Sequence, residues 1–420
     1  MNKKTKIIYL INHPPAYEEW GNLPKPEINF DTPEGSWVGI WGKDWAHFLL
    51  NEIIRITDDY TFEVWQPDKR ADRTYNITFK NGLTHKSFPT KEIQTRTFFN
   101  SETEYYSESI IINLNKEAAQ NEKVIFVTAF ETSAQLKKLL SASSKNIFLV
   151  IHHLGNTITL LQRHHKSFIK NIYRLIEFNF INKEYLKLIK YFILSNEEGS
   201  DKLAELTKAK LFLDKHYPVG IDFNFWKSDA TSEESRKILK IAGDKFVILS
   251  SSRLNGLKQI DKLIICLSKL RHRNYLCYIS GHGTREYEAY LSKLITQHGL
   301  GENIKLIGYV ETNELKNYYQ SCNIFISVSS CEGGPTSPLY AMLLKKPVLV
   351  TKTGKTFEFM KRVSRGYTIP VDNITEWTEI IDKLIDKDEL ETIPLKEAID
   401  FVDWDNIANF YNNTFKEILK

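Results

Sequence analysis

Residues 324–342 read Ile-Phe-Ile-Ser-Val-Ser-Ser-Cys-Glu-Gly-Gly-Pro-Thr-Ser-Pro-Leu-Tyr-Ala-Met. This pattern predicts a buried strand, a loop that contains Gly333 and Gly334, and a helix that begins near Ser337. A helix start exposes backbone N–H groups, and glycines before it let a ligand approach closely. Such a place favours anions, above all phosphate. On its own, a glycine pair before a helix reads equally well as an ordinary turn.

The same order of apolar run, loop and helical pattern recurs along most of the chain. Strands are predicted at 6–11, 62–65, 124–127, 148–151, 192–195, 246–250, 276–280, 304–307, 324–327 and 348–350. Amphipathic stretches that predict helices lie at 43–56, 133–140, 260–270, 286–298 and 314–321. Strands that alternate with helices imply βαβ units, and therefore an α/β fold with parallel sheets covered by helices on both faces.

The length of 420 residues is too great for one compact core, and about 150 residues per domain gives two to three domains. The alternation lapses once, between about residues 216 and 245, a stretch that contains Pro218, Gly220 and a polar run. We therefore expect two doubly wound domains, over 1–217 and 218–402. The closing segment, 403–420, predicts a helix with Asp403 as its N-cap residue.

Composition narrows the function classes. A hydrophobic fraction of 42% and a charged fraction of 26% are typical of globular proteins and exclude disorder and coiled coil. A net charge of +4 argues against a nucleic-acid partner. Four cysteines without a C-x-x-C pair predict reduced core residues. The N-terminal apolar run at 7–11 is too short for a signal peptide, and no window approaches the roughly 20 apolar residues of a membrane span. We expect a cytoplasmic protein.

Three further loops follow predicted strands in the second half. Arg253 and Lys258 flank the first, within Ser250–Asp261, and suit phosphate oxygens, although either cation alone reads as a solvated surface residue. The other loops are Ser280–Thr284 and Gly308–Glu311. Because the carboxyl ends of parallel strands meet at one edge, four such loops predict a nucleotide-binding crevice.

Taken in order, five segments resemble the retaining glycosyltransferases of family 4, which have the GT-B fold of two Rossmann-like domains facing across a cleft. The segments are Ser-Arg-Leu-Asn-x-x-Lys at 252–258, Ser-Gly-His-Gly at 280–283, Ile-Gly-Tyr-Val at 307–310, Cys-Glu-Gly-Gly-Pro at 331–335 and Lys-Lys-Pro-Val-Leu-Val at 345–350. The resemblance covers about 245–360 and the Trp404 helix, which in that fold crosses back onto the first, acceptor-side domain. The first half resembles the family only in outline.

The resemblance implies a role for each matching residue. Arg253 and Lys258 bind the diphosphate of a nucleotide-sugar donor, a UDP- or GDP-sugar, and stabilise the leaving group. Glu332 faces the donor sugar, as does His152, with His153 as an alternative. The other donor-binding residues that it implies are Gly42, Gly281, Tyr309, Val310, Gly333, Gly334, Pro335, Ser337 and Tyr340. No cofactor and no metal is expected, since the cations stabilise the diphosphate.

One position departs from the family. The second glutamate of the family's E-x7-E pattern, which accepts hydrogen bonds from the ribose hydroxyls, is here Tyr340, and a phenol offers only one oxygen. The leading hypothesis is retaining transfer of a sugar to a glycan or lipid-linked acceptor, in surface polysaccharide or glycolipid biosynthesis. A non-catalytic binding or scaffold relative and a two-domain nucleotide-sugar epimerase are the alternatives.

The first half adds two features. Residues 162–190 interleave cations with apolar residues. This pattern is typical of an ordinary packed helix with a solvated basic face, and also of a basic helix on the inner face of an anionic membrane. Trp37, Trp41 and Trp45 follow an irregular early loop. Aromatic rings stack on sugars, which favours an acceptor-side role, while core packing explains at least Trp45.

Overall fold

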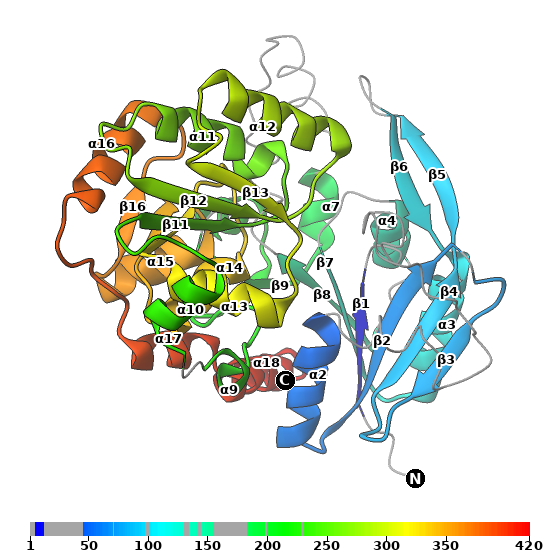
Figure 1. Cartoon of the computed structure of the whole chain (residues 1–420). Coiled ribbons are helices and arrows are strands. Elements are labelled where there is room, and N and C mark those ends of the chain that lie inside the picture. Colours follow the sequence, from blue (N-terminus) through cyan, green and yellow to red (C-terminus); the bar gives the residue numbers. More distant parts are fainter. Residues whose placement is uncertain are drawn as a thin grey trace. The chain divides into compact units, whose positions relative to one another are not determined.

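The computed structural model describes residues 5–11, 45–69, 71–96, 101–129, 134–141, 144–153, 183–197, 200–227 and 230–420. The chain divides into two compact units, each built around its own sheet (Figure 1). Unit 1 contains Met1–Gly220 and Trp404–Lys420, and unit 2 contains Ile221–Asp403. No helix in the described ranges is long and apolar enough to cross a membrane.

Unit 2 has a six-stranded, wholly parallel sheet in the order β13-β12-β11-β14-β15-β16. Its strands are β11 (Phe246–Ser251), β12 (Tyr275–Ser280), β13 (Ile304–Gly308), β14 (Ile324–Ser327), β15 (Val348–Thr351) and β16 (Tyr367–Ile369). This is the strand order of a Rossmann domain, and it reverses between β11 and β14. The carboxyl ends of these two strands therefore mark the place where such a sheet binds ligands.

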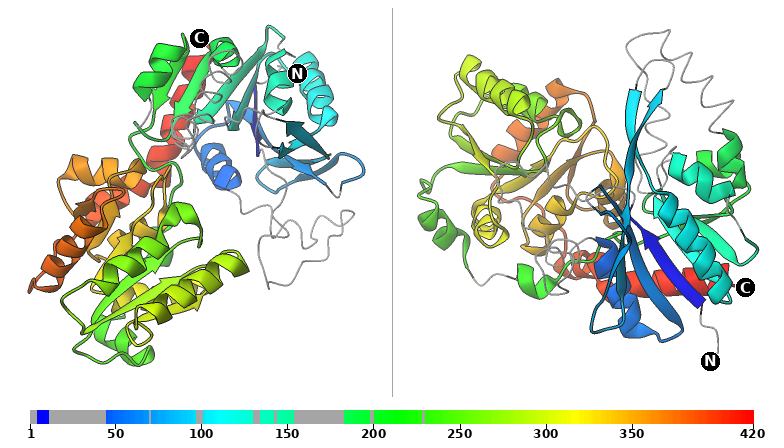
Figure 2. Two further views of the ribbon diagram at one scale, coloured as in Figure 1. Left: turned by 90° about the horizontal axis from the view of Figure 1, so that it is seen from above. Right: turned by 90° about the vertical axis from the view of Figure 1, so that its right-hand side faces the viewer.

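Helices cover both faces of the unit 2 sheet, as the doubly wound prediction requires (Figures 1 and 2). The helices are α9 (Phe223–Trp226), α10 (Ser232–Ile238), α11 (Ile260–Ser268), α12 (Arg285–Gln297), α13 (Thr312–Ser321), α14 (Thr336–Leu343), α15 (Gly354–Val363), α16 (Ile374–Ile385) and α17 (Leu395–Val402). Apolar residues of α11, α12 and α16 share one buried cluster with the sheet, around Leu263, Leu291 and Trp377. All four cysteines lie buried in this unit as free thiols, as predicted.

Unit 1 has an eight-stranded sheet in the order β10-β9-β8-β7-β1-β2-β4-β3. Its strands are β1 (Thr5–Leu10), β2 (Tyr60–Asp68), β3 (Tyr75–Thr78), β4 (Thr84–Pro89), β7 (Val124–Ala129), β8 (Ile147–His153), β9 (Tyr191–Leu194) and β10 (Lys210–Leu213). All neighbours are parallel except β3, which is antiparallel to β4. A separate antiparallel pair joins β5 (Lys91–Arg96) to β6 (Ser101–Tyr106).

The expectation of a single lapse in the alternation is therefore wrong, because strands β3 to β6 follow one another without a helix. The physical reason is visible in β3, whose side chains alternate between exposed and half-buried. Such a strand needs no apolar run, whereas an apolar run is the pattern that predicts a buried strand.

Two helices that are distant in sequence pack side by side in unit 1 (Figure 2). They are α2 (Trp45–Ile56) and α18 (Trp404–Ile418), and both contribute to one buried cluster with the sheet. The predicted return of the C-terminal helix to the first domain is thus confirmed. Gly220, the last residue before unit 2, allows this return, because a Cβ there would lie 2.1 Å from a ring carbon of Trp404.

Other helices cover the remaining sheet surface of unit 1. They are α3 (Glu108–Gln120), α4 (Ala134–Ser141), α7 (Lys183–Leu188) and α8 (Ser200–Leu206). Leucines and isoleucines of α3 and α4 pack against β1, β2 and β7. Thus unit 1 is also doubly wound.

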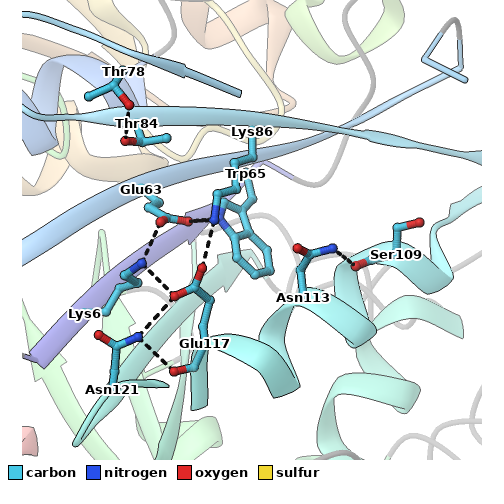
Figure 3. A network of polar contacts seen from close by, with 10 residues as sticks. All are labelled: Lys6, Glu63, Trp65, Thr78, Thr84, Lys86, Ser109, Asn113, Glu117 and Asn121. Carbon is cyan, nitrogen blue, oxygen red and sulfur yellow. Dashed lines mark hydrogen bonds and ion pairs between the residues drawn. The ribbon is translucent and has the colours of Figure 1, made fainter. Parts of the chain in front are cut away.

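A closed ring of four charges ties β1, β2, β4 and α3 together near the amino end of β1 (Figure 3). The Lys6 ammonium contacts Glu63 at 2.7 Å and Glu117 at 2.6 Å, and the Lys86 ammonium contacts the same two carboxylates, each at 2.8 Å. The Trp65 indole N–H donates to Glu63 at 2.6 Å. The four charged side chains are only 8–15% exposed, so each depends on its partners.

A buried histidine pair joins α2 to β4. His47 Nε2 and His85 Nδ1 lie 2.9 Å apart, and each residue is 1% exposed. His85 Nε2 lies 3.3 Å from the Ser87 hydroxyl. Burial, with the neighbouring His47 as a lesser cause, holds the pKa of His85 well below its usual value.

This lowered pKa predicts that acid destabilises unit 1. The unfolded chain takes up a proton at His85 near pH 6.5, whereas the folded chain does not until well below it. The free energy of unfolding should therefore fall by up to about 1.4 kcal/mol per pH unit below 6.5. Urea unfolding at pH 7.5, 6.5 and 5.5 measures the slope, which His85→Gln should flatten and the exposed control His298→Gln should leave unchanged. Equal slopes in all three proteins would contradict the assignment.

Candidate active site

The loop after β11 carries both predicted cations. Asn255 Oδ1 accepts hydrogen bonds from the backbone N–H groups of Leu257 at 3.1 Å and Lys258 at 3.3 Å. This cap closes a single 3-10 turn over Gly256–Lys258, directly before α11. The turn fixes the backbone of Lys258 at the carboxyl edge of the sheet. Arg253 lies earlier in the loop and is exposed.

Lys258 and Glu332 meet across the point where the strand order reverses. The Lys258 ammonium forms an ion pair with Glu332 Oε1 in the loop after β14, and the two side chains are 15% and 10% exposed. The Ser330 N–H donates to the Leu257 carbonyl oxygen at 2.8 Å, which fastens one loop to the other. The structure thus brings together a cation and an acid from loops 74 residues apart in sequence.

The loop after β12 supports the Arg253 loop. Gly281 has a φ of +136°, and a Cβ there would lie 1.7 Å from the Ser252 carbonyl oxygen. The Leu254 N–H donates to the His282 carbonyl oxygen at 2.6 Å. Only glycine at 281 permits this close approach, so its role in the present structure is to let the two loops run together.

Two aromatic rings are presented at the ends of β12 and β13. The rings of His282 and Tyr309 are nearly parallel, with centroids 6.0 Å apart, and Tyr309 is 44% exposed. Val310 beside it is buried. An exposed flat surface at this edge is suited to stacking with a planar ligand group.

The loop after β14 leads into α14. Pro335 is the N-cap residue, and it cannot offer a side-chain hydrogen bond to the first turn. The Ser337 carbonyl oxygen accepts a hydrogen bond from the Tyr319 hydroxyl at 3.0 Å, which holds the start of the helix against α13. Gly333, Gly334 and Ser337 are half-buried. The start of this helix therefore offers backbone N–H groups close to Glu332 and Lys258.

Tyr340 is half-buried and packs among aromatic side chains of unit 2. Its ring stacks on Trp226 of α9 with centroids 3.8 Å apart, and it meets Tyr319 edge-on at 6.1 Å. Burial raises the pKa of its hydroxyl. Trp226 had no place in the sequence prediction because it lies in the stretch interpreted as a domain junction. The sequence signal that could have indicated this contact is the presence of two aromatic residues, Trp226 in that stretch and Tyr340 in α14.

His152 lies at the end of β8 in unit 1. Its side chain is 0% exposed, with the Tyr9 hydroxyl 2.6 Å from Nδ1 and the hydroxyls of Ser195 and Tyr411 at 3.0 and 3.2 Å from Nε2. Trp45 packs against the His152 ring, with centroids 5.0 Å apart, so Trp45 is a packing residue. The role of His152 at a donor sugar stays a prediction.

Several predicted positions lie outside the described residues. These are Gly42, Trp37, Trp41, the side chain of His153 and the part of the basic stretch before residue 183. Within the described ranges, no group of three or more His, Cys, Asp or Glu residues is arranged to hold a metal ion.

Part of the chain is similar in sequence to known glycosyltransferases. Residues 231–400 match the model of the glycosyl transferases group 1. The chain is 26% identical over 203 residues to an uncharacterized glycosyltransferase of Methanocaldococcus jannaschii, covering 46% of this chain and 52% of that protein. It is 27% identical over 176 residues to the alpha-monoglucosyldiacylglycerol synthase of Acholeplasma laidlawii, covering 40% and 43%. The chain thus spans about half the length of the curated relatives it matches.

Solved structures show the fold. Sucrose-phosphate synthase from Thermosynechococcus elongatus superimposes with a TM-score of 0.69 at 12% identity, over 99% of both chains. Anabaena HepE, solved in complex with UDP, superimposes with a TM-score of 0.64 at 16% identity, over 98% of this chain and 100% of that one. Both carry the two Rossmann-like domains of the GT-B fold, as this chain does. The part of the chain that matches the group 1 glycosyl transferases, residues 231–400, lies within unit 2.

Proposed function

We propose that the protein transfers a sugar from a nucleotide-sugar donor to a glycan or lipid-linked acceptor, and that unit 2 binds the donor. The observation that carries the proposal is the Lys258–Glu332 pair at the reversal point of a Rossmann sheet. HepE, which has the same fold, has been solved with UDP and with UDP and glucose. A UDP-sugar is therefore the donor that we propose first, ahead of a GDP-sugar.

In this proposal the donor diphosphate binds where positive charge and free N–H groups converge. Lys258 supplies a compact charge and Arg253 a planar fork of donors. The start of α14 adds backbone N–H groups and the positive end of its dipole. The Glu332 carboxylate accepts hydrogen bonds from the sugar hydroxyls, and the exposed face of Tyr309 lies beside the base. Because the cations offset the diphosphate charge, the proposal includes no metal.

The proposed reaction retains the configuration of the sugar. The bond between the anomeric carbon and the diphosphate oxygen breaks, and its electron pair leaves with the diphosphate. The acceptor hydroxyl attacks from the same face and passes its proton to a departing phosphate oxygen. Lys258, Arg253 and the α14 N-terminus stabilise the growing negative charge. No side chain acts as a nucleophile in this scheme.

The acceptor class follows from two features. The Acholeplasma laidlawii relative is named for a glucosyldiacylglycerol product, and the 162–190 stretch is rich in cations and apolar residues. Both suit an acceptor that is carried on a lipid at the inner face of a cytoplasmic membrane. We place surface polysaccharide or glycolipid assembly ahead of transfer to a small soluble sugar for this reason.

A thermal-shift screen of UDP, UDP-glucose, UDP-galactose, UDP-N-acetylglucosamine and GDP-mannose tests the proposal. A donor at 100 times its dissociation constant should add about 2.7 kcal/mol to the free energy of unfolding. Slow release of UDP from the donor that binds, accelerated by a lipid extract, is the expected second result. Stabilisation by none of the five would contradict nucleotide-sugar binding.

Tyr340 favours a second candidate, a relative that binds a nucleotide sugar without transferring it. The phenol is held in the Trp226 stack and offers the ribose no carboxylate. For this candidate the screen should give stabilisation without UDP release under any acceptor condition. Release of UDP that depends on acceptor rules it out.

A further inference from the structure

We infer that Gly354, at the start of α15, is a positioning residue for Glu332. The inference rests on the proposed function for its meaning, because Glu332 is the acid assigned to the donor sugar. Gly354 follows β15, the next strand along the sheet from β14. It had no role in the sequence prediction.

The geometry leaves no room for a side chain at this position. A Cβ on Gly354 would lie 2.5 Å from the Glu332 carbonyl oxygen and 2.7 Å from the Glu332 Cβ. Both atoms belong to the backbone or to the first side-chain carbon, so neither moves without moving the whole residue. The φ of Gly354, +73°, lies in the left-handed region, which disfavours other residues independently.

Other contacts bind the same loop to the β15 side. The Lys355 N–H donates to the Gly333 carbonyl oxygen at 3.1 Å. The Thr351 hydroxyl donates to the Ser329 carbonyl oxygen at 2.6 Å. Together with the Ser330 bond to Leu257, these contacts hold the 329–333 loop from both flanking strands. Glu332 therefore lies against the start of α15 while its carboxylate pairs with Lys258.

The consequence is that the orientation of Glu332 depends on α15 as well as on Lys258. Adding a methyl group at 354 pushes Glu332 away by about 1 Å, a displacement of the size that lowers rates about 10²-fold. The Lys258 ammonium then loses its partner and becomes more accessible.

The test compares Gly354→Ala with Gly366→Ala as the matched control. Gly366 has a similar φ of +83° and lies beyond the other end of α15. The atoms nearest to a Cβ added there belong to the side chains of Met360, Ile393 and Val348. Both variants carry the same backbone strain, so both should lose similar stability. Only Gly354→Ala should disturb Glu332. Gly354→Asn separates the two causes further, because asparagine tolerates a left-handed φ but still carries a Cβ.

The first readout needs no donor. Acetylation of Lys258 by N-hydroxysuccinimide acetate, followed by mass spectrometry with Lys262 as internal reference, should be faster in Gly354→Ala, Gly354→Asn and Glu332→Ala than in the wild type. It should be unchanged in Gly366→Ala. Equal Lys258 rates in Gly354→Ala and Gly366→Ala would overturn the inference. If Gly354→Ala does not fold, Thr351→Val, which loosens the same loop, takes its place with the same expectation.

The second readout is turnover of UDP-glucose. We expect kcat to fall about 10²-fold in Gly354→Ala, with no further loss when the change is added to Glu332→Ala, because both act through one side chain. If the two losses of kcat multiply in the double variant, the inference is overturned. Failure of the wild type to bind any nucleotide sugar would contradict the proposed function instead, and the acetylation result would still decide the role of Gly354.

Discussion

Replacing Lys258 by alanine is expected to lower the rate of sugar transfer by about 10²- to 10³-fold, the usual loss for one preorganised group that stabilises a leaving group. Lys258 lies at the reversal point of the unit 2 sheet and is the cation closest to Glu332 in the described structure. Arg253→Ala should give a loss of the same order. The Arg253→Ala, Lys258→Ala double variant should transfer sugar no faster than the slower of the two single variants.

Matched controls separate this effect from general loss of charge. Lys262 lies four residues after Lys258, in the first turn of α11, and pairs with Asp372 instead. Arg271 pairs with Asp382 and Asp386 at the amino end of β12. Lys262→Ala and Arg271→Ala should therefore retain transfer. Initial rates of UDP release with acceptor give the comparison, and full turnover by the Arg253→Ala, Lys258→Ala double variant would show that the diphosphate is bound elsewhere.

Glu117→Gln is expected to lower the free energy of unfolding of unit 1 by about 3 kcal/mol, the lower end of the cost of breaking a buried charge pair. The variant leaves two ammonium groups facing the single carboxylate of Glu63. Burial by itself raises the pKa of Glu117, but hydrogen bonds from Lys6 and Lys86 offset it and hold the pKa below its usual value.

This lowered pKa fixes the sign of the pH effect. The ionised form of Glu117 is favoured in the folded state, so its contribution is complete above about pH 4.3 and is lost as the pH falls through the folded pKa. Urea unfolding at pH 7 should show the full difference between wild type and variant, and the difference should shrink in acid. The exposed control Glu122→Gln should match the wild type. Equal free energies of unfolding for Glu117→Gln and the wild type would show that solvent screens the four charges from one another.

The strands of unit 2 could be predicted because they are buried on both faces. A strand such as β14 reads as an unbroken apolar run, and its order with the following loop and helix fixes a βαβ unit. The strands β3 to β6 could not be found this way, because partly solvated strands carry polar side chains and the signal relied on apolar ones.

The site was predictable as a set of loops but not as a set of contacts. That Lys258 and Glu332 lie in loops at one sheet edge follows from the βαβ pattern. That their side chains pair depends on the strand order, which places β14 beside β11 although the chain visits two other strands between them. The stack of Tyr340 on Trp226 and the contact of Gly354 with Glu332 depend on the same non-local packing, which no local pattern encodes.

A crystal structure of the protein soaked with UDP tests the central claim most directly. The account predicts a diphosphate at the carboxyl ends of β11 and β14, with Lys258 Nζ and the Arg253 guanidinium within hydrogen-bond distance of its oxygens. A diphosphate bound at any other edge of either sheet, or one that leaves Lys258 paired only with Glu332, would contradict it.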